Sequence, residues 1–183
     1  MIIQIQHRKT MKTKSSLKSI ILVLLFAIAT TASAQIKIPE TNVSFDFPSG
    51  GWKYLQTNKL SNNTVIYLYS YAADYVIDSS GDTIIPFMRI YVRKNYDGNV
   101  YDLAYSRFMV QPFQSLDEKM HPNGMLEYLG AYTNEDDGKD YEFKMVYVKD
   151  RSNILEIRLE STVDTFEEFE EDFTGIVSSI KTN

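Results

Sequence analysis

Tyrosine and arginine alternate with other residues in two neighbouring stretches of the sequence, as side chains do on one face of a β-strand. If the two strands pair, these side chains can form a platform that binds a sugar ring, a peptide or an anion. The alternative is that they cover a half-exposed face and keep their polar tips in water. That second interpretation is favoured, because β-rich faces ordinarily carry such pairs. The predicted ligand-binding residues are Tyr67, Tyr69, Arg89, Tyr91 and Arg93.

The acidic loop at residues 134–140 is a weak candidate for a metal site through Asp136, Asp137 and Asp140. Calcium takes about six to eight oxygen ligands, and an EF-hand needs glycine at its sixth position and glutamate at its twelfth. With Gly138 in the sixth position, Lys144 stands in the twelfth. A solvated hairpin turn with Asp-Gly geometry explains the loop better, so we expect no metal.

Catalytic chemistry has little support in the sequence. His121 is the only histidine after residue 34, and it stands in a turn beside Pro122. Metal sites and catalytic triads need clustered partners. The sequence also lacks the G-x-S-x-G, P-loop and H-E-x-x-H strings. We therefore predict no catalytic residue, no cofactor and no enzymatic activity. A pair of carboxylates that folding brings together remains the one basis for a hydrolase.

Residues 1–34 have the features of a cleavable signal peptide. Lys12, Lys14 and Lys18 precede an apolar run at residues 20–29, and small residues at 32–34 form a cleavage pattern. The run is shorter than the roughly 20 residues that span a bilayer, which argues against a membrane anchor. We expect the mature chain to begin at Gln35, with Met11 as an alternative start of translation. The predicted location is periplasmic or extracellular, with no stable membrane anchor after cleavage.

Composition restricts the possible partners. The chain has no cysteine, which excludes disulfides, thiolate metal sites and an acylated cysteine. The 149 residues from 35 to 183 hold 14 basic and 24 acidic side chains and carry a net charge of −10. This charge argues against nucleic acid and anionic lipid. The length is typical of one domain, and the expected partner is an unknown envelope protein or a small ligand.

The strongest structural element is a helix at residues 164–181. Its apolar residues recur at steps of three and four and therefore share one face: Phe166, Phe169, Phe173, Ile176 and Ile180. Acidic residues occupy most of the other side. Asp164 is the predicted N-cap, and Glu167 three residues later completes a capping-box pattern. A second, weaker helix is predicted at residues 99–110.

The remaining pattern predicts an antiparallel sheet of about six strands. Two short strands at residues 36–39 and 43–47 are followed by a hairpin over residues 64–93 and a meander over residues 125–160. The strand at residues 141–149 is apolar on both faces, which indicates that both faces of the sheet are covered. The predicted fold class is α+β, an α/β/α sandwich with helices over the sheet.

The strings FDFPSGGW at residues 45–52 and FEEFEEDFTGIVSSIK at residues 166–181 make the chain similar to the PsbP-like family of exported domains. The resemblance extends over residues 35–183 and implies a single PsbP-like α/β/α sandwich domain. It carries no shared catalytic motif. It favours an exported, non-catalytic accessory or binding domain of the bacterial cell envelope. The alternatives are a secreted module that binds a ligand on the Tyr/Arg face and a carboxylate-dependent hydrolase.

Overall fold

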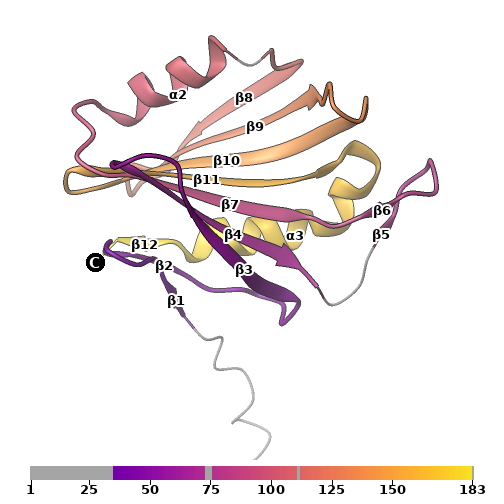
Figure 1. Ribbon diagram of the computed structural model, residues 1–183, viewed down its shortest axis with the longest axis horizontal. Helices are drawn as coiled ribbons and strands as arrows, with labels where there is room; N and C mark the ends of the chain where they lie inside the picture. The colour runs from indigo at the N-terminus through magenta and orange to yellow at the C-terminus, as the bar shows by residue number, and fades with distance from the viewer. Residues whose placement is uncertain (1–34, 73–75, 111, 183) are drawn as a thin grey trace, which may run out of the picture. The chain divides into compact units, whose positions relative to one another are not determined.

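A seven-stranded antiparallel sheet forms the centre of the fold (Figure 1). The structure is a computed structural model that describes residues 35–72, 76–110 and 112–182, so the predicted signal peptide lies outside the described residues. The order across the sheet is β3 (Trp52–Lys59), β4 (Thr64–Tyr71), β7 (Phe87–Arg93), β11 (Asn153–Thr162), β10 (Asp140–Asp150), β9 (Leu126–Thr133) and β8 (Ser115–Met120). β7 and β11 are therefore neighbours, although a helix and three strands of the same sheet lie between them in sequence.

Two small sheets accompany the large one. β2 (Val43–Phe45) pairs with both β1 (Ile36–Lys37) and β12 (Lys181–Thr182), so the last strand of the chain lies beside one of the first. β5 (Val76–Ile77) and β6 (Thr83–Ile84) form a separate hairpin. These pairings place residues from both ends of the domain against one core.

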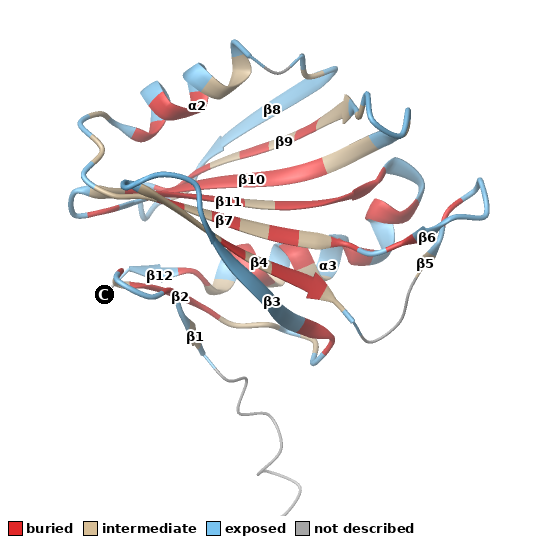
Figure 2. Cartoon of the chain, in the orientation of Figure 1, coloured by how far each residue is buried: buried red, intermediate tan, exposed pale blue. Residues whose placement is uncertain are grey.

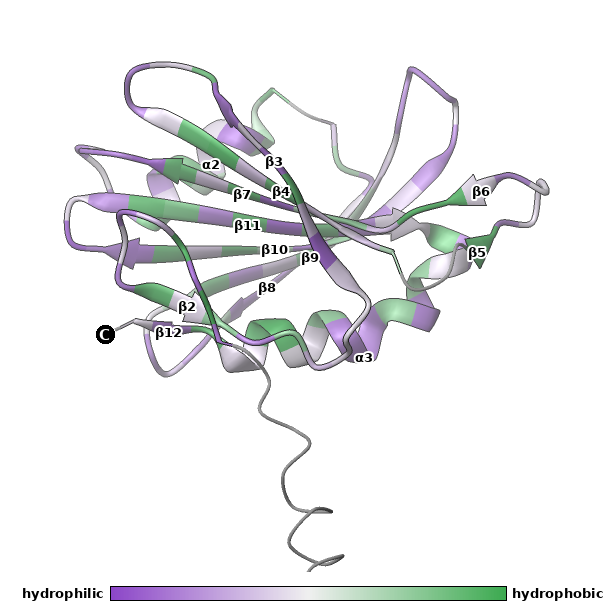
Figure 3. Cartoon of the chain, turned by 60° about the horizontal axis from the view of Figure 1, so that its bottom comes forward, coloured by the Kyte–Doolittle hydropathy of each residue, from purple (hydrophilic) through white to green (hydrophobic). Residues whose placement is uncertain are grey.

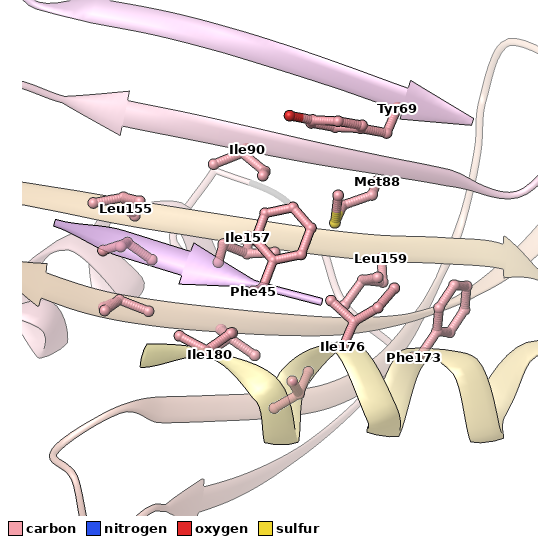
Figure 4. Close-up of a cluster of buried hydrophobic side chains, with 14 of the residues drawn as sticks. Phe45, Tyr69, Met88, Ile90, Leu155, Ile157, Leu159, Phe173, Ile176 and Ile180 are labelled. Carbon is pink, nitrogen blue, oxygen red and sulfur yellow. The ribbon is translucent and has the colours of Figure 1, made fainter. Parts of the chain in front are cut away.

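The larger core lies between the sheet and α3 (Val163–Ser179). Figure 3 brings this side forward and shows hydrophilic residues concentrated in the N-terminal half of α3. The five apolar side chains predicted to share a helix face are all buried, which confirms that prediction. They pack with β2 and with the central strands, as Figure 4 shows for Phe45, Ile157 and Ile176.

The smaller core lies on the opposite face of the sheet, beneath α2 (Val100–Phe108). Val100, Leu103 and Ala104 of this helix are buried against residues of β9, β10 and β11. The helix predicted at residues 99–110 is therefore present and slightly shorter. Because it has only 9 residues, it covers one part of a wide sheet face.

The capping residues of the two helices differ in kind, and that of α3 differs from the prediction. The N-cap of α2 is Asn99, which forms a capping box with Asp102. The N-cap of α3 is Thr162, whose side chain makes no capping hydrogen bond. The prediction that Asp164 caps this helix is wrong, because its carboxylate instead accepts the backbone N–H of Ser79 at 2.5 Å.

The predicted α/β/α sandwich, a six-stranded sheet covered by helices, is wrong. The described residues are 48% strand and 18% helix, with a seven-stranded sheet and two helices. The sequence pattern missed β3 and β8, which form the two edges of the sheet and are exposed along most of their length (Figure 2). Strands with so little buried surface need no alternation of apolar and polar residues.

None of the helices within residues 35–72, 76–110 and 112–182 combines the length and apolar character needed to cross a bilayer.

Candidate functional site

The register between β4 and β7 separates the predicted tyrosines from the predicted arginines. Tyr67 lies opposite Ile90, and Tyr69 lies opposite Met88. Arg89, Tyr91 and Arg93 alternate with those core residues and therefore lie on the other face of the sheet. The prediction of one shared Tyr/Arg platform is wrong, because paired strands place directly opposite residues on the same face.

Tyr67 and Tyr69 belong to the core beneath α3 rather than to an open surface. Both are buried, and Figure 4 shows Tyr69 above β7, the strand that carries Met88 and Ile90. The Tyr69 ring packs edge-on against Phe45, with 6.1 Å between ring centroids. Burial raises the pKa of Tyr69 to about 12. These two tyrosines contribute to packing, so a ligand on the arginine face does not reach them.

On the other face of the sheet, Arg93 lies beside Glu156 of the adjacent strand β11. Glu156 is buried and only 2% exposed. Arg107 of α2 binds the same carboxylate with two hydrogen bonds, from Nε at 3.1 Å and from Nη2 at 3.2 Å. The Arg93 Nη2 nitrogen lies 3.5 Å from Glu156 Oε2. The Arg107 guanidinium also stacks over the Tyr91 ring, 5.2 Å from its centroid. Glu156 thus joins α2 to β7 and β11.

A second carboxylate, Glu160, lies four residues further along β11 on the same face of the sheet and is 3% exposed. It forms ion pairs with Arg89 and with Arg158, the latter with 2.6 Å between Nε and Oε2. The Tyr132 hydroxyl donates a hydrogen bond to Glu160 at 3.3 Å. Arg158 also stacks over the Tyr132 ring, 4.8 Å from its centroid. A buried carboxylate requires such partners, because desolvation without them is costly.

We call this set the arginine–glutamate network. Its members are Arg89, Arg93, Arg107, Arg158, Glu156 and Glu160. Four guanidinium groups surround two carboxylates, so the network carries an excess of two positive charges within an acidic protein. Arg89 and Arg107 side chains are 35% and 34% exposed, and therefore reach solvent. The buried Nε of Arg93 has no hydrogen-bond acceptor among the described residues.

The charges of the network affect the pKa values of two groups, Arg107 within the network and Tyr147 beside it. Burial alone lowers the pKa of an arginine, but the charge and hydrogen bonds of Glu156 outweigh it, and the pKa of Arg107 is raised. Burial, followed by the charge of Glu156, also raises the pKa of the Tyr147 hydroxyl. Arg107 is therefore a permanent cation, and Tyr147 is neutral at physiological pH.

The sequence prediction included Arg89, Tyr91 and Arg93 but missed the other members of the network. Alternation of Glu156, Arg158 and Glu160 opposite a run of apolar residues was visible in the sequence. It would have suggested a solvent-exposed face, because charged residues in such a pattern usually face water. Nothing in the sequence pairs residues 153–162 with residues 87–93, and this pairing is what assembles the network.

The other predicted positions do not form a site. Asp137 accepts the Tyr141 hydroxyl, whereas Asp140 accepts the Thr133 hydroxyl. Among the described residues, no group of three or more acidic, histidine or cysteine side chains is placed to hold a metal ion. The predicted set of Asp136, Asp137 and Asp140 therefore does not form such a group. His121, in the connection between β8 and β9, pairs with Glu127 of β9 at 2.5 Å. These contacts are those of a turn and of a strand connection.

The fold and the network define a mostly β domain with an open antiparallel sheet and a cationic face. No model of a protein family matches the chain, and no curated protein matches it either. Among solved structures, the chain is similar to LpqN of Mycobacterium tuberculosis, which is involved in cell envelope biogenesis. The two share 13% sequence identity, over 80% of this chain and 88% of LpqN, with a TM-score of 0.47. A likeness at this level carries no conclusion about function, and membership of the PsbP-like family stays a prediction.

Proposed function

We propose that this chain is an exported, non-catalytic binding domain of the cell envelope that recognises an anionic group through its arginine–glutamate network. The observation that carries the proposal is the excess of two positive charges in that network, with the Arg89 and Arg107 side chains about one-third exposed. A phosphate or carboxylate group on an envelope component has the matching charge. Guanidinium groups bind both through paired hydrogen bonds.

The two glutamates make the arginines suitable for binding. Glu156 holds Arg93 and Arg107, and Glu160 holds Arg89. Long side chains lose rotamer freedom when they bind a ligand, and that loss weakens affinity. Arginines already held by buried carboxylates lose less.

A binding role is also supported over the carboxylate-dependent hydrolase. A hydrolase of that kind needs one carboxyl group as proton donor and a second in a different environment. Glu156 and Glu160 have similar environments, because each is buried and each is held by two arginines. The carboxylate oxygens of both glutamates pair with guanidinium groups and hold the arginines in position.

Export rests on the signal-peptide pattern of residues 1–34, and the absence of cysteine is compatible with a domain stabilised by its core alone. Fractionation of the producing cells, with mass spectrometry of the N-terminus, tests this part. We expect the protein outside the cytoplasm and beginning at Gln35. A full-length chain in the cytoplasm would contradict it.

Titration of the purified protein with inorganic phosphate at low ionic strength, followed by NMR, tests the binding role. We expect chemical-shift changes at the Nε–H groups of Arg89 and Arg107. The double substitution Arg89→Gln/Arg107→Gln should weaken binding at least roughly tenfold, because it removes two charge-assisted partners. The single change Arg107→Lys keeps the charge but loses the paired geometry, so an intermediate loss is expected.

Lys53→Gln is the matched control, because Lys53 is an exposed cation on β3, at the edge of the sheet. It should leave phosphate binding unchanged. Circular dichroism of each variant separates lost binding from lost folding. Equal binding by wild type and by a folded Arg89→Gln/Arg107→Gln protein would refute the role of the network.

A further inference from the structure

A second surface, on the far side of α2 from the arginine–glutamate network, forms an apolar groove against β8 and β9. Four aromatic rings line it, from Tyr101, Tyr105 and Phe108 of α2 and Tyr128 of β9, together with Leu116 of β8. Its volume is about 550 Å³. That volume lies within the range of small-ligand and side-chain sites. We call this surface the aromatic groove.

Two of the four rings in the groove, those of Phe108 and Tyr128, are held in place. Phe108 packs edge-on against Tyr128, with 4.6 Å between ring centroids. The Tyr128 hydroxyl donates a hydrogen bond to Glu118 of β8 at 2.8 Å. Burial and then this hydrogen bond raise the pKa of Tyr128, so its hydroxyl keeps its proton. The groove therefore has a fixed aromatic floor.

The charged side chains that line the groove are all acidic. Its lining includes two carboxylates, Asp102 and Glu118, and no basic residue. The Asp102 carboxylate accepts the backbone N–H of Asn99, and Glu118 accepts from Tyr128, so both stay at the surface of the groove. Aromatic faces and carboxylates both attract organic cations, the former through cation–π contact. The complementary ligand carries an ammonium or guanidinium group on an apolar stem.

The groove runs beside an edge of the sheet. β8 is the last strand in the sheet order, so within the described residues only β9 pairs with it, and all six of its residues are exposed (Figure 2). Half of the exposed large apolar side chains in the described residues lie on α2, just after it, or on β8: Tyr101, Tyr105, Met109, Val110, Leu116 and Met120. An open strand edge beside apolar pockets is the arrangement that binds extended peptides.

We propose that the aromatic groove and the free edge of β8 together bind an extended segment of a partner protein, in which basic side chains alternate with apolar ones. The segment adds to β8 as a further antiparallel or parallel strand. A lysine or arginine enters the groove beside Glu118 with its apolar stem over Leu116 and Tyr105, and the alternating apolar side chains project to the other face of the added strand. The charge of the whole mature chain, −10, favours the approach of a basic segment.

This inference goes beyond the proposed function, because it concerns a different surface and a ligand of opposite charge. The two surfaces share α2, but Arg107 faces Glu156, whereas Tyr101 and Tyr105 line the groove. Loss of binding at one surface is therefore distinguishable from loss at the other.

The test uses a fluorescent, N-acetylated octapeptide of alternating lysine and valine, and measures its binding to the purified protein by fluorescence anisotropy. We expect the same peptide with glutamate in place of lysine to bind at least roughly tenfold more weakly, because it faces like charges. NMR shift changes from the lysine peptide should map to the amides of β8 and to the rings of the groove. N-methylation of alternate peptide bonds should abolish binding, because strand addition uses main-chain hydrogen bonds.

Two substitutions on the protein complete the test. Tyr105→Ala, at a side chain that is 67% exposed, should weaken binding of the lysine peptide roughly fivefold or more. Glu118→Gln should do the same, while its amide oxygen still accepts the Tyr128 hydroxyl. The control Tyr54→Ala changes an exposed tyrosine on the opposite edge strand and should have no effect.

Either of two outcomes would overturn the proposal. In the first, the lysine and glutamate peptides bind equally or neither binds. In the second, binding survives N-methylation or is the same in Tyr105→Ala and in the Tyr54→Ala control.

Discussion

Glu156 and Glu160 are single residues on which a large part of one sheet face depends. Each is an ionisable group buried beneath arginines, and apart from Arg158 on the same strand, the arginine partners come from elements that are distant in sequence. A buried ion pair contributes less to stability than its geometry suggests, because desolvation offsets much of the attraction. Its effect here is to hold four guanidinium groups in one arrangement. That arrangement is what the proposed anion binding uses.

Asp164 is a residue whose ionisation should affect stability at acid pH. The backbone N–H of Ser79 donates to its carboxylate and lowers the pKa of Asp164 from 3.8 to about 2. A pKa that is lower in the folded state stabilises the fold above the unfolded value, and this contribution is lost as the pH falls from 3.8 towards 2. Urea unfolding of wild type should therefore show a free energy that decreases over this window.

The substitution Asp164→Asn removes the ionisable group and should flatten that part of the pH dependence. Circular dichroism at a series of pH values measures the unfolding free energy of both proteins. The same slope in wild type and in Asp164→Asn would show that the Ser79 hydrogen bond does not stabilise the folded carboxylate.

Among the elements, β8 is an edge strand held to the sheet by one neighbour. It pairs only with β9 within the described part of the chain, at a position where β9 carries Gly130 opposite Leu116. A Cβ atom at Gly130 would lie 2.5 Å from the backbone oxygen of Ser115 and 2.7 Å from Phe143 Cζ. Glycine therefore lets the edge strand and the Phe143 ring approach β9 from two sides.

Gly130→Ala should destabilise the protein by about 1–3 kcal/mol, because backbone atoms of β8 must move to admit the methyl group. Chemical denaturation measures this change, and hydrogen exchange should show the largest loss of protection in β8. Gly138→Ala is unsuitable as a control because Gly138 has a positive φ of 70°. Gly50→Ala is suitable, because its Cβ would meet nothing within 4 Å. Equal stability of Gly130→Ala and Gly50→Ala would contradict the close approach of β8.

At the scale of the whole molecule, a cluster of aromatic rings around Trp52 packs β3, the segment after β2 and α3 together. Trp52 stacks on Phe47 at 5.7 Å and contacts Phe173 of α3 at 5.9 Å, both between ring centroids. The indole N–H also donates to Asp172 at 3.2 Å. Because Trp52 is the only tryptophan in the sequence, its fluorescence reports on this junction.

Phe173→Ala should destabilise the whole domain by about 3–5 kcal/mol, because it leaves a cavity at a fully buried position. Denaturant unfolding followed by Trp52 fluorescence and by circular dichroism should give coincident transitions at a lower midpoint. Glu167→Ala, on the exposed side of the same helix, should change the unfolding free energy by about 0.5 kcal/mol or less. A similar small effect of both substitutions would mean that α3 does not hold the core together.

The sequence predicts a structural feature well when residues close in sequence determine it. The amphipathic face of α3 was predicted correctly, because each apolar residue of a helix is placed by neighbours three or four positions away. The edge strands β3 and β8 were missed because their exposed residues carry no alternating pattern. The candidate site was predicted only in part, through Arg89, Tyr91 and Arg93.

Composition and short-range spacing thus establish an acidic, cysteine-free chain with a signal-peptide pattern and a closing helix that has one apolar face. The pairing of β7 with β11 and the register of β4 against β7 come from contacts between distant segments. A shift of one residue in register would move every side chain of a strand to the other face. For that reason only the tertiary structure could place Tyr67 and Tyr69 in the core and gather Arg89 and Arg93 with Glu156 and Glu160.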